Sequence, residues 1–243
     1  MAVFIIGDLH LSLGCEKPMD VFQGWQDYVP RLEKNWRALV APQDTVVLAG
    51  DTSWGMKLEE SLEDFRFLEA LPGRKVLLKG NHDYWWTTAA KMAAFFEANG
   101  LRSFLVLHNQ SVLCEDEHIA LCGTRGWLAG QPDAHSGKVY AREVGRLCAS
   151  LAHAQAHYPL AERVAVLHSP PVYGGGSARE MLDVLAQYGV KRCFYGHLHA
   201  ASIRRAAQGS IEGVEYRLIS ADALQFCPYK ILSVCGNPWI CMV

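Results

Sequence analysis

Five short apolar segments of this chain each end in polar side chains that can bind metal ions. The segments are rich in β-branched and aromatic residues, a pattern typical of buried strands. The sequences that follow them are Gly7-Asp8-Leu9-His10, Gly50-Asp51, Gly80-Asn81-His82-Asp83, His168-Ser169 and Gly196-His197-Leu198-His199. In open α/β sheets, ligands bind at the carboxyl ends of the strands. The pattern therefore predicts that Asp, Asn and His side chains gather at one such edge.

Helical patterns alternate with the strands, because apolar residues recur every three or four positions with charged residues between them. The predicted strands are 3–6, 45–49, 75–79, 119–122, 164–168 and 192–195, with weaker candidates at 103–107 and 214–220. The predicted helices are about 31–40, 57–71, 87–98 and 139–157. A further helix is expected after Ser177, which has capping-box spacing with Glu180. This alternation predicts an α/β fold.

We expect a single domain over residues 1–243, since half of the residues are hydrophobic and no repeat or linker divides the chain. The polar segment from Ala129 to Lys138 is interpreted as a surface insertion. The apolar tail 226–243 fits a final strand, a packed tail or a partner-binding segment, and these three interpretations stay open.

The polar residues after the strands have the chemistry of a divalent-metal site. Carboxylates supply hard oxygens that bridge ions, Asn supplies a carbonyl oxygen and His supplies nitrogen, a mixture that suits Mn, Fe, Zn or Co better than Mg or Ca. Residues i and i+2 of an extended chain share a side, so Asp8 with His10, and His197 with His199, can face one site. Each motif alone also fits a turn or a buried histidine. Their joint occurrence after five strands predicts a metal site.

In this order the motifs resemble those of the calcineurin-like metallophosphoesterase superfamily. The stretches Gly50-Asp51-Thr52-Ser53-Trp54 and Lys79–Trp86 further resemble a bacterial group of predicted phosphohydrolases. The resemblance implies a two-sheet β-sandwich flanked by helices in four layers, with a two-metal centre at one edge.

The same resemblance assigns roles to individual residues. It implies that the first metal is held by Asp8, His10 and His199, the second by Asn81, His168 and His197, and that Asp51 bridges both. His82 falls at the position of a non-ligand histidine that stabilises or protonates the leaving group. Asp83 would then orient His82 from behind.

Two branches of the superfamily fit less well. Its protein Ser/Thr phosphatases usually carry Asp-Arg-Gly after Gly-Asp and Arg before Gly-Asn-His, where this chain has Ser53-Trp54-Gly55 and Lys79. Its lipid-A-pathway pyrophosphatases usually carry Arg at the position of His82. The sequence therefore disfavours both subclasses.

The predicted reaction is hydrolysis of a phosphomonoester or phosphodiester. Two divalent ions, the carboxylates Asp8 and Asp51 and a bridging hydroxide leave a net charge of about +1 facing a phosphate. We expect direct attack by the metal-bound hydroxide, with His82 assisting the leaving group. Mn, Fe or Zn are the expected ions, Co is compatible and Mg is less suited.

Four side chains are candidate substrate contacts. Trp54 and Trp85 lie beside the motifs and either wall the pocket or belong to the core. Arg125 follows a strand and either holds a phosphate oxygen or pairs with a carboxylate. Tyr173 precedes three glycines that form either a mobile flap or a plain connection.

The formal net charge of −2 argues against a generally basic nucleic-acid-binding surface, so the expected partner is a small phosphate ester. A nuclease of the same superfamily and a non-catalytic scaffold with this fold remain alternatives. No apolar run reaches the ~18–20 residues of a membrane span, and the first residues lack the features of a signal peptide. We therefore expect a cytoplasmic protein with no membrane partner. The sequence carries no signal of oligomeric state.

Overall fold

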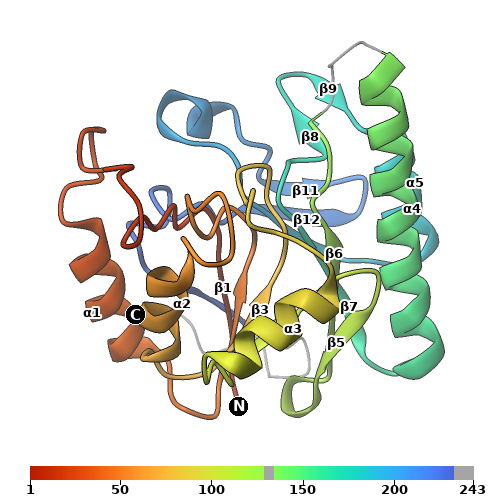
Figure 1. Cartoon of the computed structure of the whole chain (residues 1–243). Coiled ribbons are helices and arrows are strands. Elements are labelled where there is room, and N and C mark those ends of the chain that lie inside the picture. Colours follow the sequence, from red (N-terminus) through yellow and green to blue (C-terminus); the bar gives the residue numbers. More distant parts are fainter. Residues whose placement is uncertain (129–133, 233–243) are drawn as a thin grey trace.

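The computed structural model describes residues 1–128 and 134–232, and it contains two mixed β-sheets packed face to face (Figure 1). The five-stranded sheet consists of β1 (Val3–Ile6), β2 (Thr45–Leu48), β3 (Arg74–Leu77), β4 (Phe104–Val106) and β13 (Tyr229–Ile231). Its order is β13-β1-β2-β3-β4, in which β1 to β4 are parallel and β13 is antiparallel to β1.

The six-stranded sheet consists of β5 (Ser111–Cys114), β6 (Ile119–Thr124), β7 (Glu162–Leu167), β10 (Arg192–Tyr195), β11 (Gly209–Ile211) and β12 (Val214–Leu218). Its order is β11-β12-β10-β7-β6-β5, with antiparallel pairs only at the two edges. A small hairpin is formed by β8 (Val172–Tyr173) and β9 (Gly176–Ser177).

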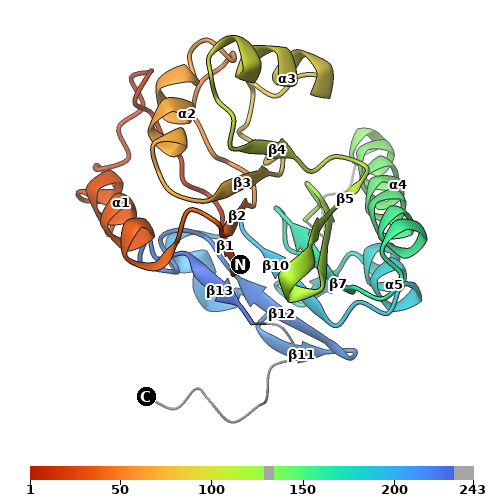
Figure 2. The ribbon, with the colours of Figure 1, turned by 90° about the horizontal axis from the view of Figure 1, so that it is seen from below.

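Helices cover the outer faces of both sheets (Figure 2). The five-stranded sheet is covered by α1 (Tyr28–Leu39), α2 (Leu62–Glu69) and α3 (Ala89–Ala98). The six-stranded sheet is covered by α4 (Ala134–His157) and α5 (Arg179–Gln187). Two short 3₁₀ helices are η1 (Glu115–Glu117) and η2 (Ala200–Arg205). Within the described residues, no helix combines the length and the apolar character that a membrane span requires.

Alternating side chains of each strand supply different layers of the core. In β1, Val3 and Ile5 pack between the two sheets, whereas Phe4 and Ile6 pack with Trp36 of α1 on the outer face. A separate cluster joins the six-stranded sheet to α4 and α5. The expected two-sheet sandwich flanked by helices is thus confirmed, and it follows from strands that are buried on both faces.

Several local expectations differ from the structure. The helix expected from residue 57 begins at Leu62, because residues 57–61 form turns. The predicted capping box is wrong: Ser177 pairs with Val172 in the β8–β9 hairpin, and α5 begins after Ala178 without a side-chain cap.

The two segments without a firm prediction are partly described. In the tail 226–243, β13 pairs with β1, and residues 233–243 lie outside the described part of the chain. In the expected insertion 129–138, residues 129–133 also lie outside it, and α4 begins at Ala134.

Lys75 is a fully buried cation in β3, and its Nζ donates to the carbonyl oxygen of Leu71. Burial lowers the pKa of Lys75 from 10.5 to about 8. Between these two pH values the unfolded chain binds more protons than the folded chain, so stability rises with pH through this residue. From pH 7.5 to 10.5, the free energy of unfolding of the wild-type chain should rise by about 3 kcal/mol more than that of Lys75→Met. Urea unfolding at several pH values measures the difference.

The exposed residue Lys34 of α1 offers a matched control. Lys34→Met removes a lysine without emptying a buried site, and its pH profile is measured in parallel. Parallel profiles for wild type and Lys75→Met would contradict the buried-charge interpretation.

Candidate metal centre

The carboxyl ends of β1, β2 and β3 meet those of β7, β10 and β12 at one edge of the sandwich. The N–H of Gly7 donates to the carbonyl oxygen of Ile219 (2.8 Å), and the N–H of Ala221 donates to that of Gly7 (2.9 Å). These bonds join the end of β1 to the segment after β12. Polar residues that follow strands of both sheets therefore reach a common site.

The first cluster at this edge contains Asp8, His10 and His199. One ligand atom from each residue lies within 4.8 Å of the others. Nε2 of His199 is 3.3 Å from Oδ1 of Asp8 and 3.4 Å from Nε2 of His10. Asp8 and His10 are buried, whereas His199 is partly exposed.

The second cluster contains Asn81, His168 and His197. Oδ1 of Asn81 lies 2.7 Å from Nε2 of His168 and 2.8 Å from Nδ1 of His197, and these two nitrogens are 3.3 Å apart. Asp51 lies between the clusters: its Oδ2 is 3.4 Å from Nε2 of His168 and 4.0 Å from Nε2 of His10. The structure thus brings together all seven residues that the sequence analysis assigned as ligands.

The ligand atoms of the second cluster are better suited to bind a cation than to form hydrogen bonds with one another. Nδ1 of His168 donates to the carbonyl oxygen of Ala49 (3.1 Å), so Nε2 of the neutral ring carries a lone pair. That lone pair faces Oδ1 of Asn81, which is also an acceptor. Two ligand atoms that are each about 2.1 Å from the same ion lie about 3.0–3.5 Å from each other, and several of the distances given above fall in this range. The buried residues therefore fit a metal ion.

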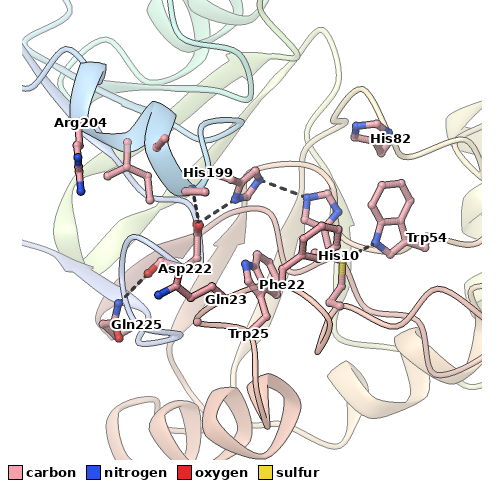
Figure 3. Close-up of a pocket in the computed structure, with 15 residues that line it drawn as sticks. His10, Phe22, Gln23, Trp25, Trp54, His82, His199, Arg204, Asp222 and Gln225 are labelled. Carbon is pink, nitrogen blue, oxygen red and sulfur yellow. Dashed lines mark hydrogen bonds and ion pairs between the residues drawn. The ribbon is translucent and has the colours of Figure 1, made fainter.

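Asp222 orients a histidine of the first cluster and was not predicted. Its Oδ1 lies 2.9 Å from Nδ1 of His199, and its Oδ2 accepts the N–H of Ala200 (3.1 Å) (Figure 3). A carboxylate at Nδ1 fixes the ring so that Nε2 faces Asp8, a common arrangement behind metal-binding histidines. The available signal was its position after the weak strand candidate 214–220, which resembles that of the other polar residues.

The carboxylates of the two clusters perturb the pKa values of their neighbours. Burial, and next the charge of Asp8, raise the pKa of Asp51 above its usual range. Burial is also the largest single effect on Asp8 and opposes its ionisation, but the charge and hydrogen bond of His199, together with the charges of His168 and His10, outweigh burial and lower the pKa of Asp8. Burial alone would lower the pKa of His199, whereas Asp8 and Asp222 raise it. Without a metal, the site therefore retains protons that a divalent cation would displace.

Four of the seven residues have left-handed backbone conformations. The φ angles are 59° at Asp8, 48° at His10, 49° at Asp51 and 72° at His197. Such conformations are costly for residues other than glycine and occur often at functional sites. Backbone hydrogen bonds from Asp8 to Gly50 and from His10 to Asp51, both 2.9 Å, hold the first three turns together.

Two glycines before the ligands are required by close packing, not only by strand termination. A Cβ atom on Gly80 would lie 2.0 Å from Oδ1 of Asp51, and one on Gly196 would lie 2.2 Å from Oδ2 of Asp8. Each glycine therefore leaves room for a carboxylate supplied by a different strand.

Gly196→Ala should displace the carboxylate of Asp8 and lower kcat/KM on an aryl phosphate by about 100-fold, since small misplacements at a reacting centre have large effects. Metal content and steady-state kinetics measure the effect. Gly145→Ala is the control, because Gly145 is exposed on α4 with no atom within 4 Å of an added Cβ. Equal kinetics in the two variants would contradict this role of Gly196.

Asp83 does not contact His82, so the expectation that it orients this ring from behind is wrong. Its carboxylate accepts the N–H groups of Asp51 (2.9 Å), Thr52 (2.9 Å) and Gly80 (2.7 Å), and Nε1 of Trp85 (3.0 Å). Asp83 instead joins the loops after β2 and β3, and thereby positions Asp51 and Asn81.

His82 lies beside the clusters without belonging to them. Its backbone N–H donates to Oδ1 of Asp51 (2.7 Å), and its ring centroid is 4.8 Å from that of Trp54. Nδ1 is buried and has no hydrogen-bond partner among residues 1–128 and 134–232. Burial lowers the pKa of His82, and a phosphate anion beside the ring would raise it again.

Two cavities flank the clusters. The larger one has a volume of about 760 Å³ and is lined by His10, His82 and His199 together with Met19, Phe22, Trp25, Trp54, Ile203, Arg204 and other residues (Figure 3). The smaller one, of about 230 Å³, is lined by Asn81, Arg125, Trp127, Leu128, Ser169 and His197. A substrate phosphate at the clusters would have room on both sides.

The four expected substrate contacts lie in different places. Trp54 lines the larger cavity and stacks on His10 at 4.8 Å, and Arg125 lines the smaller one. Trp85 is buried among core residues and packs edge-on against Phe65, so it has the position of a core residue, not of a pocket wall. Tyr173 lines neither cavity and packs under the guanidinium of Arg205 (5.0 Å).

Comparison with known structures supports the fold. Phosphopantetheinyl hydrolase (PptH) from Mycobacterium tuberculosis aligns with a TM-score of 0.59 and 14% identity, over 100% of this chain and 98% of that one. TT1561 of Thermus thermophilus aligns with a TM-score of 0.52 and 12% identity, over 95% of this chain and 98% of that one. A search of curated protein sequences returned no significant match.

The sequence also matches a family model described as calcineurin-like phosphoesterase over residues 1–201. The match spans the residues of both clusters. This chain is therefore a member of the calcineurin-like phosphoesterase family and a metal-dependent hydrolase that acts on ester bonds.

Proposed function

We propose that this protein hydrolyses small phosphate monoesters or diesters with two metal ions, one at each cluster. The observation that carries the proposal is the position of Asp51, whose Oδ2 faces Nε2 of His168 and Nε2 of His10. One carboxylate is thereby available to both clusters. When bound, two such ions attract a phosphate anion and activate a water molecule for in-line attack.

The protein side chains supply the rest of the reaction. Nε2 of His82 donates a proton to the leaving oxygen, so that an alcohol departs and not an alkoxide. Arg125, held near Trp127 (5.2 Å to the ring) and 4.0 Å from Glu143, binds a phosphoryl oxygen in the smaller cavity. Asp83 keeps Asp51 and Asn81 in place through its hydrogen bonds to the backbone.

The mixture of ligands sets the expected metals. Each cluster combines imidazole nitrogens with oxygens of Asp or Asn, which favours Mn, Fe or Zn over Mg. Removal of metal by a chelator should abolish hydrolysis, and one of these ions should restore it.

An activity panel with reconstituted protein tests the proposal. The substrates are bis-aryl phosphate, mono-aryl phosphate, cyclic nucleotides, a phosphopantetheinyl ester and short DNA, each with Mn, Fe, Co, Zn and Mg. Metal-dependent turnover of at least one small ester supports the proposal and ranks monoesters against diesters. Turnover of DNA alone would favour a nuclease. No turnover despite two bound ions per chain would favour a non-catalytic scaffold.

A further inference from the structure

The larger cavity is much larger than a phosphate group requires. Its volume of about 760 Å³ lies in the range of cavities that enclose drug-sized ligands. Most of its lining is apolar and comes from two segments, Met19–Trp25 before α1 and Ala200–Ile203 of η2. A simple phosphate anion would leave this apolar surface uncovered.

The polar groups of the cavity extend from one side of it to the other. Figure 3 shows His82 and Trp54 on one side of the cavity, Arg204 and Gln225 on the other, and His10 and His199 between them. His82, the proposed donor to the leaving oxygen, lines this cavity and not the smaller one. The part of the substrate that occupies the larger cavity is therefore the leaving group.

Arg204 is a positively charged residue of this cavity that has no ion-pair partner among the described residues. It forms no ion pair or side-chain hydrogen bond with residues 1–128 or 134–232, although its neighbour Arg205 packs on Tyr173. Asp222, the only carboxylate among the described residues of the lining, is already bonded to His199 and to the N–H of Ala200. An anionic group at this end of a ligand would therefore meet an available guanidinium.

We propose that the leaving group is an extended, mainly apolar alcohol with an anionic group at its far end, which Arg204 binds. The proposal rests on the proposed function, since it assigns the leaving group of that reaction. Hydrolysis adds water across the P–O bond and releases the alcohol, whose oxygen takes its proton from His82. Phe22 and Ile203 then contact the apolar part of the alcohol.

Matched substrates test the charge at the far end. The probes are phosphomonoesters and methyl phosphodiesters of ω-hydroxy acids with six, eight or ten carbons, and of the corresponding ω-hydroxy amides. Alcohol release by the Mn²⁺-loaded protein gives the ratio of kcat/KM between acid and amide. We expect a ratio of about five for wild type, the size of an exposed ion pair. Arg204→Glu should bring the ratio below one.

Arg205→Glu is the matched control, because Arg205 is also exposed on η2 but does not line the cavity. Its ratio should stay within about twofold of wild type.

A second pair of variants tests the apolar contact. Phe22→Ser should lower kcat/KM for acid and amide alike by about fivefold, because it removes an apolar surface that the ligand covers. Val21→Ser should have little effect, since Val21 is exposed and outside the lining.

Binding without metal separates this inference from the proposed function. Trp25 and Trp54 line the cavity, so their fluorescence should report titration of the metal-free protein with 8-hydroxyoctanoate or 8-hydroxyoctanamide. Tighter binding of the acid, lost in Arg204→Glu and kept in Arg205→Glu, supports the inference even if no ester is hydrolysed. Equal binding and equal hydrolysis of acid and amide in wild type would overturn it and leave the proposed function intact.

Discussion

Asp51→Asn is expected to remove metal binding and hydrolysis together. Oδ2 of Asp51 faces His168 of one cluster and His10 of the other, so a single carboxylate serves both. Asn has nearly the same size and its amide oxygen can still accept the N–H of His82, but it lacks the negative charge. We expect fewer than about one ion per chain after reconstitution, and a loss of kcat/KM of at least about 10³-fold. Elemental analysis and steady-state kinetics measure both quantities.

Asp64→Asn is the matched control for this variant. Asp64 is also a buried carboxylate on the helix-covered side of the five-stranded sheet, but it accepts hydrogen bonds from Ser53 and the N–H of Leu13 and is not one of the cluster residues. Burial raises its pKa to about 6, so its ionised form is less favoured than that of an exposed carboxylate, and Asn has nearly the same size. This variant should keep both ions. Full metal content in Asp51→Asn would show that Asp51 is not shared between the clusters.

The sequence predicted the central strands because they are buried on both faces and appear as short apolar runs. It gave no strand prediction for β5 or β11, and β13 lies in the unassigned tail. These edge strands have three or four residues and are partly exposed. A partly exposed strand does not need a regular pattern of apolar residues, so the sequence carries little signal of it. Its pairing also depends on a strand far away in the sequence, as β13 depends on β1.

The seven clustered residues could be predicted because each follows a buried strand, and the carboxyl ends of parallel strands meet at one edge. The surrounding contacts could not be predicted in the same way. Asp83 binds backbone N–H groups, which no pattern of side chains reveals. Trp85 follows a motif as Trp54 does, but the turn after β3 directs its ring into the core.

The glycines of the motifs show the same limit. In the sequence, Gly80 and Gly196 fit simple strand termination. In the structure each faces a carboxylate from another motif, Asp51 and Asp8 respectively. The motifs are therefore physically coupled, within the five-stranded sheet for Gly80 and Asp51 and between the two sheets for Gly196 and Asp8: a glycine of one motif leaves the room that a ligand of another motif needs. That coupling explains why the residues work as a set, and why the effect of a variant must be read from metal content as well as from rate.

His82→Ala is expected to lower turnover while both ions stay bound, in contrast to Asp51→Asn. His82 lines the larger cavity, and its ring atoms form no hydrogen bond with the described residues. Its removal leaves the carboxylates and the other histidines in place. A positioned general acid contributes about 10²–10⁴-fold, and this is the loss of kcat that we expect on esters of alkyl alcohols.

The size of this loss should depend on the leaving group. A nitrophenolate departs readily without a proton, so His82→Ala should reduce its release far less than the release of an alkyl alcohol. Kinetics on a series of esters that differ in the acidity of the alcohol measure this dependence, with metal content determined in parallel. His108→Ala is the control, because His108 is a partly buried histidine that lines neither of the two cavities beside the clusters. An equal loss on nitrophenyl and alkyl esters would assign His82 to binding of the phosphate instead of protonation of the leaving oxygen, since a contact to the phosphoryl group is the same for every ester.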